Sequence, residues 1–252
     1  MTISEPNPSH MNQLRQLWTA AFGDGDDFLD MFYTTAYAPH RCRCILDGDR
    51  VAAVLYWFDC TFEGRKLAYV YAVATDLGYR NQGLCRRLME DTAAHLTEQG
   101  YAAALLLPQD PGLRQMYGKM GYLPCTTIGE FSCQAAGEPL EITELTAETY
   151  AALRKTMLPP GSVLQEGENL SYLSGFVRFF RTGDTIFALF QEHDQIICYE
   201  ILGEATKAPA ILRTFGARSG IFRYPGKEKD FTMYLPFVAN LPTPEHFAFA
   251  FD

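Results

Sequence analysis

The sequence predicts an α/β protein in which helices cover a mixed β-sheet, and three observations lead to this expectation. Two amphipathic helical patterns come before a run of three strand-like segments separated by turn signals. A longer helical pattern at residues 84–99 then leads into YAAALLLP (residues 101–108), a short and continuously apolar stretch. Strand–helix–strand connections join parallel strands, whereas short turns join antiparallel ones, so we expect both kinds of pairing in one sheet.

The chain is expected to start with two helices and to continue into a β-meander. Ser9 is a candidate cap for the first helix, in which apolar residues recur at spacings of three and four until Gly23. Asp26 opens the second helix, which ends near Pro39. Three strands with turn sequences between them follow, at residues 41–46, 51–62 and 66–75.

The segment after the meander alternates between helix and strand. Residues 84–99 carry apolar side chains on one helical face, and Gly100 closes this helix. The apolar run at 101–108 has the composition of a strand that is buried on both faces. A short helix is predicted next at residues 112–120, and Gly121 ends it. Where parallel strands of such a sheet separate, a ligand can enter.

The composition changes after Phe131, where the polar connector SCQAAGEPLEITELTAETY begins. We therefore expect two domains, residues 1–135 and residues 139–252. The second domain is predicted to repeat the order helix, hairpin, helix and strands in a looser form. Its elements are expected at residues 147–156, 185–190, 195–201, 209–214, 220–224, 231–237 and 247–251.

Composition and charge exclude several classes of protein. The chain has 252 residues, of which 48% are apolar and 20% charged, an ordinary globular mixture. A formal net charge of -9 argues against a nucleic-acid partner, which requires a basic surface. No apolar run approaches the roughly 18 residues of a spanning helix, and the start MTISEPNPSH does not resemble an export signal. We therefore expect a cytoplasmic protein without a membrane partner.

The seven cysteines are odd in number and lie scattered through predicted strands and helices. This is not the pattern of a disulfide framework. Cys42 and Cys44 lie one residue apart, and no second pair of Cys or His residues follows to complete a tetrahedral metal site. We expect reduced, packed thiols and no metal.

The start of the helix after the meander carries the most specific chemistry. YRNQGLCRRLME (residues 79–90) places arginines and Gly83 where this helix begins, at about Gln82. The first N–H groups of a helix have no internal partners, and its dipole puts a partial charge of about +0.5 there. Gly83 would let a phosphate approach without a Cβ in the way. A plain tight turn with solvated arginines is the alternative, but the strand LAYVYAVAT (residues 67–75) directly before it favours an anion site.

Two segments resemble a known family. VATDLGYRNQGLCRRLME (residues 73–90) resembles the acyl-CoA signature R/Q-x-x-G-x-G/A of the GCN5-related N-acetyltransferases (GNAT), with Arg80, Gly83 and Cys85 on its three defining positions. LRQMYGKMGYLP (residues 113–124) resembles the later segment A-x-x-x-Y-x-x-x-G-F of that family, at Tyr117 and Gly121. The sequence departs from the pattern at Cys85, where Gly or Ala is usual, and at Leu77, where Pro is common.

The resemblance implies a GNAT-like acyl-CoA N-acyltransferase fold and transfer of an acetyl group from acetyl-CoA to a primary amine of a small molecule or peptide. It implies that backbone amides of the strand hold the pantetheine and the thioester carbonyl, at Val73, Ala74 and Thr75. It implies that the pyrophosphate lies on the amides of Asn81, Gln82, Gly83, Leu84, Cys85 and Arg86. Side chains could add charge-assisted contacts from Arg80, Arg86 or Arg87. Tyr117 matches the tyrosine that protonates the coenzyme A thiolate; a core residue is the alternative.

The general base is left open. Asp59, Glu63, a residue of the second half or water could accept the amine proton. The carboxylate of Asp252 is a further possibility, because larger tandem acetyltransferases of the enhanced-intracellular-survival type use their chain end in this way.

The second half resembles an acetyltransferase-like domain in the order of its predicted elements. It is expected to be degenerate, because no segment after Glu138 matches the phosphate signature. Its aromatic residues could line an acceptor cleft or pack in a core: Tyr172, Phe176, Phe179, Phe180, Phe222 and Tyr224. Two other functions compete with acetyl transfer. One is a catalytically silent acyl-CoA-binding or regulatory module, and the other is a nucleotide-binding domain that uses the same helix start.

Overall fold

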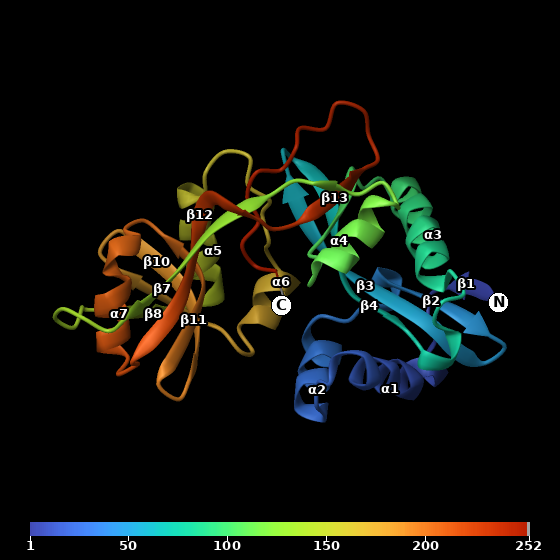
Figure 1. Cartoon of the computed structure of the whole chain (residues 1–252), viewed down its shortest axis with the longest axis horizontal. Helices are drawn as coiled ribbons and strands as arrows, with labels where there is room; N and C mark the ends of the chain where they lie inside the picture. The colour runs from blue at the N-terminus through green and yellow to red at the C-terminus, as the bar shows by residue number, and fades with distance from the viewer. Residues whose placement is uncertain (251–252) are drawn as a thin grey trace. The chain divides into compact units, whose positions relative to one another are not determined.

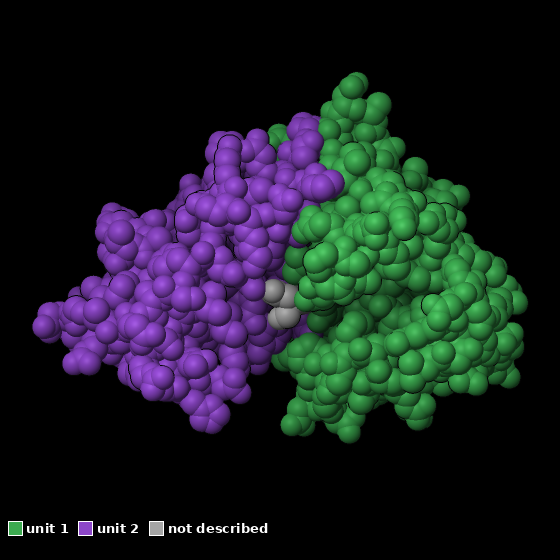
Figure 2. Space-filling model, in the orientation of Figure 1, with its two compact units in different colours: residues 1–123, 233–241 green, residues 124–232, 242–252 purple. Residues whose placement is uncertain are grey.

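The computed structural model describes residues 1–250, which form two compact units (Figures 1 and 2). Unit 1 consists of Met1–Leu123 and Met233–Leu241, and unit 2 consists of Pro124–Thr232 and the chain from Pro242 onward. Each unit contains one mixed sheet. The predicted α/β fold with mixed strand pairing is therefore confirmed.

The sheet of unit 1 has seven strands in the order β1-β2-β3-β4-β5-β13-β6. In that order the strands are β1 (Thr2–Ser4), β2 (Cys42–Asp47), β3 (Arg50–Phe62), β4 (Arg65–Thr75), β5 (Ala103–Leu106), β13 (Met233–Pro236) and β6 (Leu123–Pro124). Neighbours from β1 to β4 run antiparallel, and short turns join β2 to β3 and β3 to β4. The pair β4–β5 is parallel, and α3 (Leu84–Glu98) makes the crossover between these strands.

Helices cover both faces of this sheet (Figure 1). On one face lie α1 (Met11–Phe22) and α2 (Asp26–Thr35), and the ring of Trp18 packs 5.3 Å from Tyr56 and 5.6 Å from Tyr71. On the other face, α3 and α4 (Pro111–Gly118) contribute to an apolar cluster that includes Trp57 and Val70 of the sheet. The three short 3-10 helices of the unit are η1 (Pro8–His10), η2 (Pro39–Arg41) and η3 (Leu77–Tyr79).

The sheet of unit 2 has six strands in the order β7-β12-β11-β10-β9-β8. These strands are β7 (Thr127–Gln134), β12 (Ser219–Asp230), β11 (Gln195–Leu202), β10 (Thr185–Glu192), β9 (Arg178–Thr182) and β8 (Thr143–Leu145). The helices of the unit are α5 (Ala147–Met157), α6 (Glu168–Leu173), η4 (Ala205–Lys207) and α7 (Ala208–Thr214). The side chains of α7 pack on one face of the sheet, and Tyr150 of α5 stacks on Phe179 of the other face at 4.6 Å.

The two units repeat one topology. The series β1, α1, α2, β2, β3, β4, α3, β5 of unit 1 corresponds in order to β8, α5, α6, β9, β10, β11, α7, β12 of unit 2. In each series the last two strands are parallel and are joined by a helix. The looser repeat that the sequence suggested is therefore present at the level of topology.

The compact units do not coincide with the two predicted domains, residues 1–135 and 139–252. Strand β7 comes from the first half of the sequence but pairs with β12 in unit 2. Strand β13 comes from the second half but pairs with β5 in unit 1. Each half of the sequence thus contributes one strand to the sheet of the other half's unit. The predicted boundary between residues 135 and 139 divides the sequence into two halves and stays a prediction.

Several local predictions were wrong. Ser9 does not cap α1, because Asn7 caps the 3-10 helix Pro8–His10 instead and accepts a hydrogen bond from the Ser9 N–H at 2.9 Å. Residues 247–250 form no strand, and the rest of that predicted element lies outside the described residues. Strand β12 extends through the Gly/Pro-containing sequence to Asp230. The sequence patterns did not reveal β1, β7, β8, β9 or α6.

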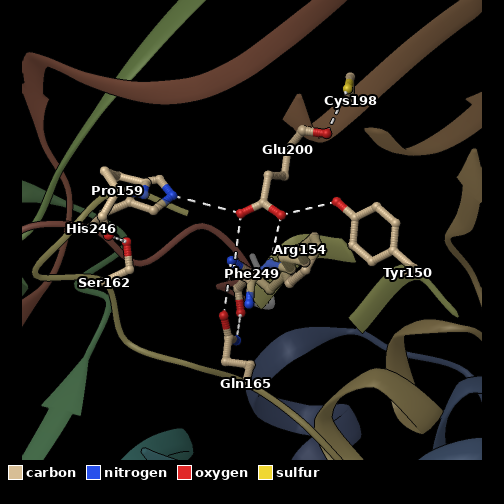
Figure 3. Close-up of polar contacts among 9 residues, drawn as sticks. All are labelled: Tyr150, Arg154, Pro159, Ser162, Gln165, Cys198, Glu200, His246 and Phe249. Atoms are coloured by element: carbon tan, nitrogen blue, oxygen red, sulfur yellow. Dashed lines mark hydrogen bonds and ion pairs between the residues drawn. The ribbon is translucent and has the colours of Figure 1, made fainter. Parts of the chain in front are cut away.

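In unit 2, a buried charged cluster connects helix α5, strand β11 and the segment around His246 (Figure 3). The Glu200 carboxylate of β11 accepts hydrogen bonds from Arg154 Nε at 2.6 Å and Nη2 at 3.0 Å, and from the Tyr150 hydroxyl at 2.9 Å. His246 Nε2 lies 3.6 Å from the same carboxylate, and Phe249 stacks over the Arg154 guanidinium. Since these carboxylate and guanidinium groups are fully buried, each depends on the other for compensation of its charge.

We expect Arg154→Met to destabilise unit 2 by about 3–5 kcal/mol, because it leaves the Glu200 charge buried without its cation. Chemical denaturation measures the loss. Arg178→Met is the matched control, since it breaks the bidentate pair with Glu144, in which both side chains are more than half exposed. The control should lose about 1 kcal/mol or less. Equal losses of unfolding free energy in Arg154→Met and Arg178→Met would contradict the inference that the buried cluster stabilises unit 2 more than an exposed ion pair does.

Acid should weaken unit 2 through the same cluster. Burial alone would raise the pKa of Glu200, but the charge and hydrogen bonds of Arg154, with His246 nearby, lower that pKa to about 2 from the ordinary 4.5. The stabilisation that follows from this lowered pKa is complete above pH 4.5 and is lost as the pH falls toward 2. Unfolding free energies at a series of pH values should show this loss in the wild type and a smaller one in Glu200→Gln.

Candidate active site

Strand β4 has an open edge over its second half. It pairs with β5 only from Leu67 to Tyr69, opposite Ala103 to Leu105. From Val70 onward, no strand among residues 1–250 pairs with this edge, although β3 stays paired on the other edge as far as Thr75. The backbone groups on the open edge are therefore available to a ligand in extended conformation, because unpaired N–H and C=O groups of a strand are strong hydrogen-bonding sites.

A β-bulge lies within this open stretch. Tyr71 and Ala74 face Tyr56 and Val54 of β3, so the two residues between them, Ala72 and Val73, lie opposite a single residue. Ala72 has a φ of 48°, a left-handed conformation that a residue with a Cβ rarely adopts. The bulge turns the strand and changes the direction of the backbone groups at its end. Val73 and Thr75 are half-buried, and Ala74 is buried.

The open strand leads directly to the start of α3. The Asp76 carboxylate accepts a hydrogen bond from the Gly78 N–H at 2.8 Å and so fixes the short turn after the strand. Asn81 and Gly83 then adopt positive φ values of 62° and 76°. Gly83 is the N-cap, and the helix begins at Leu84, as the helical pattern of residues 84–99 predicted, rather than at about Gln82.

The N-terminal amides of α3 face no helical acceptor. The first hydrogen bond at this end joins the Arg87 N–H to the Gly83 carbonyl at 3.1 Å, so the N–H groups of Leu84, Cys85 and Arg86 remain without acceptors inside the helix. Residues 80–83 are exposed, and a Cβ added at Gly83 would meet no atom within 4 Å. An anion can therefore approach these amides from solvent, where the helix dipole favours it.

The arginines around this loop already contact main-chain carbonyl groups. Arg80 Nε donates to the Thr75 carbonyl at 3.2 Å, and Arg87 Nη2 donates to the Met1 carbonyl at 3.1 Å. Arg86 Nη1 donates to the Lys119 carbonyl at the end of α4, at 3.3 Å. Their charges lie beside the anion site, although in this structure each guanidinium also has a backbone partner.

Tyr117 lies on α4 in the apolar cluster beside α3, where 7% of its surface is exposed. Its ring packs against that of Tyr122 at 5.8 Å. Burial raises the pKa of Tyr117 above its ordinary value of about 10, and the nearby Cys85 thiol adds to this. The hydroxyl therefore keeps its proton at neutral and mildly alkaline pH and can serve as a proton donor.

Cys85 occupies the first turn of α3 and is half-buried against the same cluster. Burial raises the pKa of its thiol, and the opposing effect of Arg86 does not cancel this. A protonated thiol is a poor nucleophile. Cys85 is therefore a small packing residue, and its backbone N–H, which has no acceptor inside the helix, is available to an anion.

The structure gives no support to the two carboxylates considered as bases. Asp59 lies opposite Ala68, before β5 leaves β4, and its oxygens contact the Tyr101 hydroxyl at 2.5 Å and Lys66 Nζ at 3.0 Å. Glu63 is exposed in the turn between β3 and β4, at the other end of β4 from the anion site. Asp252 lies outside the described residues. In residues 1–250, no three His, Cys, Asp or Glu side chains form a group suited to a metal ion.

Unit 2 has a similar strand geometry without a comparable helix start. Strand β11 pairs with β12 only from Gln195 to Cys198 and carries a bulge directly afterwards. However, η4 runs straight into α7, and Pro209 in the first turn has no N–H. Of the six aromatic residues that the sequence offered for an acceptor cleft, Tyr172, Phe179, Phe180 and Phe222 are buried, with Phe176 and Tyr224 half-buried.

Residues 2–125 match the sequence profile of a family described as "Acetyltransferase (GNAT) domain". This part of the chain is therefore a GNAT acetyltransferase domain, and a second, sheet-rich half follows it. No curated protein sequence is significantly similar to the chain. No helix of residues 1–250 combines the length and apolar character needed to cross a membrane.

Solved structures share the fold over nearly the full chain. A GCN5-related N-acetyltransferase from Kribbella flavida has a TM-score of 0.71 at 15% identity, covering 92% of this chain and 70% of that one. Eis1 from Mycobacterium abscessus has a TM-score of 0.65 at 12% identity, covering 93% and 73%. A tandem GNAT protein from the clavulanic acid biosynthesis pathway has a TM-score of 0.57 at 10% identity, covering 93% and 98%. At these identities the similarity shows a common fold.

Two contacts of the site were not predicted from the sequence. The turn at Asp76 has a local signal, since an Asp two residues before a Gly commonly accepts a hydrogen bond from the backbone that follows. The contact between Arg86 and the Lys119 carbonyl joins residues 33 positions apart, and no local sequence pattern predicts it.

We expect Gly83→Ala to weaken the binding of inorganic pyrophosphate, because the new Cβ would enter the open space around the N-cap of α3, and because alanine rarely adopts the φ of 76° that this position requires. Gly100→Ala is the matched control at the other end of α3, with a φ of 78° and equally open surroundings. Each variant should lose about 1 kcal/mol of stability through backbone strain. Calorimetric titration should show weaker binding for Gly83→Ala alone; equal affinities would argue against an anion site here.

Proposed function

We propose that this protein transfers an acetyl group from acetyl-CoA directly to a primary amine of a small molecule or peptide. The observation that carries this proposal is the continuous path in unit 1 from the open edge of β4 to the free amides of α3, with Tyr117 beside α3. The GNAT domain implies an amine acceptor and supports the class of reaction.

The residues along this path fit the parts of acetyl-CoA. The amides of Val73, Ala74 and Thr75 would hold the pantetheine arm and polarise the thioester carbonyl, as an oxyanion site does. The pyrophosphate would lie on the amides of residues 81–86, where Gly83 has no Cβ and its surroundings are open. Arg80 would add a charge-assisted contact.

The chain supplies one proton donor for the reaction. The neutral amine attacks the thioester carbon, so that a C–N bond forms and the C–S bond breaks. The departing thiolate takes the phenolic proton of Tyr117, and the nitrogen releases a proton to water or to a base other than Asp59 and Glu63. The raised pKa of Tyr117 keeps this acid protonated while higher pH increases the fraction of neutral amine.

We propose that the second half is a degenerate acetyltransferase-like domain without a cofactor site of its own. The merging of η4 with α7 and the missing N–H of Pro209 support the loss of a cofactor site there. A cytoplasmic location, and the absence of membrane and nucleic-acid partners, remain predictions from the sequence.

A silent acyl-CoA-binding module is the second candidate, and one observation favours it. Asp59 is engaged by Tyr101 and Lys66, and Glu63 lies in the distant turn, so neither carboxylate is placed as a base. Release of free thiol from acetyl-CoA in the presence of polyamines, aminoglycosides or amino acids separates the two functions. Binding of coenzyme A without thiol release for any amine would favour the silent module.

We expect Tyr117→Phe to lower kcat by roughly a hundred- to ten-thousand-fold, because it removes the acid but retains the ring. Its KM for acetyl-CoA should change little. Tyr122→Phe is the matched control, since it removes a hydroxyl from the neighbouring buried ring and should leave kcat near the wild-type value. Equal kcat values for Tyr117→Phe and the wild type would rule out Tyr117 as the acid.

A calorimetric preference for ATP over coenzyme A would favour the nucleotide-binding alternative.

A further inference from the structure

We propose that the Arg86 side chain is a positioning group for Tyr117, because it holds the end of α4 against the first turn of α3. This inference rests on the proposed function and assigns the guanidinium a role other than the phosphate contact expected from the sequence. Its backbone N–H still belongs to the free amides of α3. One residue would thus serve the anion site with its main chain and the proton donor with its side chain.

The contact with α4 is made where a cation is favourable. Arg86 Nη1 donates to the carbonyl of Lys119, the C-cap residue of α4, at 3.3 Å. The last carbonyl groups of a helix have no donors inside the helix, and the dipole places partial negative charge there. Arg86 therefore satisfies an acceptor that α4 cannot satisfy by itself, and it does so with a matching charge.

Lys119 is closely connected to the backbone of Tyr117. The N–H groups of Met120 and Tyr122 donate to the Tyr117 carbonyl at 2.9 and 3.2 Å, and the Lys119 N–H donates to the Gln115 carbonyl at 3.1 Å. The turn that presents the Lys119 carbonyl to Arg86 therefore closes on the residue that carries the proposed acid. A shift of this turn would move the Tyr117 backbone, because few freely rotating bonds separate the two.

The short helix α4 is held at both ends. At its start, the Asp110 carboxylate accepts a hydrogen bond from the Leu113 N–H at 2.8 Å. At its end, the Arg86 contact ties it to the helix whose amides would anchor the pyrophosphate. If acetyl-CoA is anchored on α3, the position of its sulfur is fixed relative to α3. The distance from Tyr117 to that sulfur then depends on the link between α3 and α4, and errors of about 1 Å can cost roughly a hundredfold in rate.

Arg86 has one further partner, which provides a control. Its Nη1 lies 3.7 Å from Glu90 Oε1, one helical turn along α3, and both side chains are about half exposed or more. A pair of this kind contributes little to stability. Glu90→Gln removes this ion pair and leaves the bond to Lys119 in place, so it separates the two contacts of Arg86.

The experiment compares Arg86→Gln, Arg86→Lys and Glu90→Gln by steady-state kinetics with acetyl-CoA and by calorimetric titration with coenzyme A. For Arg86→Gln we expect kcat to fall roughly tenfold, while Kd for coenzyme A stays within about threefold. Arg86→Lys retains the charge and a donor and should recover most of kcat. Glu90→Gln should behave like the wild type. Hydrogen exchange of the amides at residues 117–122 should be faster in Arg86→Gln than in Glu90→Gln.

Three results would overturn the inference. A Kd for coenzyme A weakened more than about tenfold at unchanged kcat would make Arg86 a phosphate ligand instead. Identical kinetics for Arg86→Gln and Glu90→Gln would remove any role for the bond to Lys119. Unchanged hydrogen exchange at residues 117–122 would show that Arg86 does not hold the turn, even if no turnover is found. Absence of thiol release by the wild type with every amine would count against the proposed function, whereas normal turnover in Arg86→Gln would count against this inference alone.

Discussion

The separation of β5 from β4 after Tyr69 is the constraint on which the candidate site depends. Three residue pairs hold the strands together, and the crossover helix α3 then carries the chain away from the edge of β4. A strand edge in the interior of a sheet would normally be paired, so its N–H and C=O groups need another partner. The start of α3 lies beyond the end of that edge, because α3 follows β4 and the short helix η3 in the chain. The unpaired edge of β4 and the free N–H groups at the start of α3 therefore follow one another along the chain.

The site combines exposed backbone with buried side chains. Residues 80–83 face solvent, whereas Tyr117 and Leu84 belong to the apolar cluster of unit 1. This division has a physical reason, because a charged ligand must be able to enter, whereas a tyrosine keeps its proton best when water is scarce around it. Cys85 is half-buried and lies between the exposed residues 80–83 and the apolar cluster that contains Tyr117.

The sequence predicted the elements that depend on local patterns and missed those that depend on distant partners. The meander, α3 and the exposed loop at the start of α3 follow from alternation, helical spacing and Gly83, which are local features of the sequence. The anion site at this loop stays a prediction. The cap of the first helix was predicted wrongly because the 3-10 helix Pro8–His10 runs directly into α1. Asn7 caps that 3-10 helix, and the N-cap of α1 is His10, which makes no side-chain capping bond. The partner of the Arg86 guanidinium could not be read from sequence, since it depends on how α3 and α4 pack.

The exchange of β7 and β13 between the two halves also affects the order in which the protein can fold. Strand β13 lies next to β5 in the sheet, although more than 120 residues separate them in the chain. During synthesis, a ribosome must therefore reach β13 at Met233–Pro236 before the sheet of unit 1 can be completed. Until then β5 presents an apolar, unpaired edge, which is a recognised risk for aggregation in slowly forming sheets. The arrangement makes the two halves mutually dependent during biosynthesis.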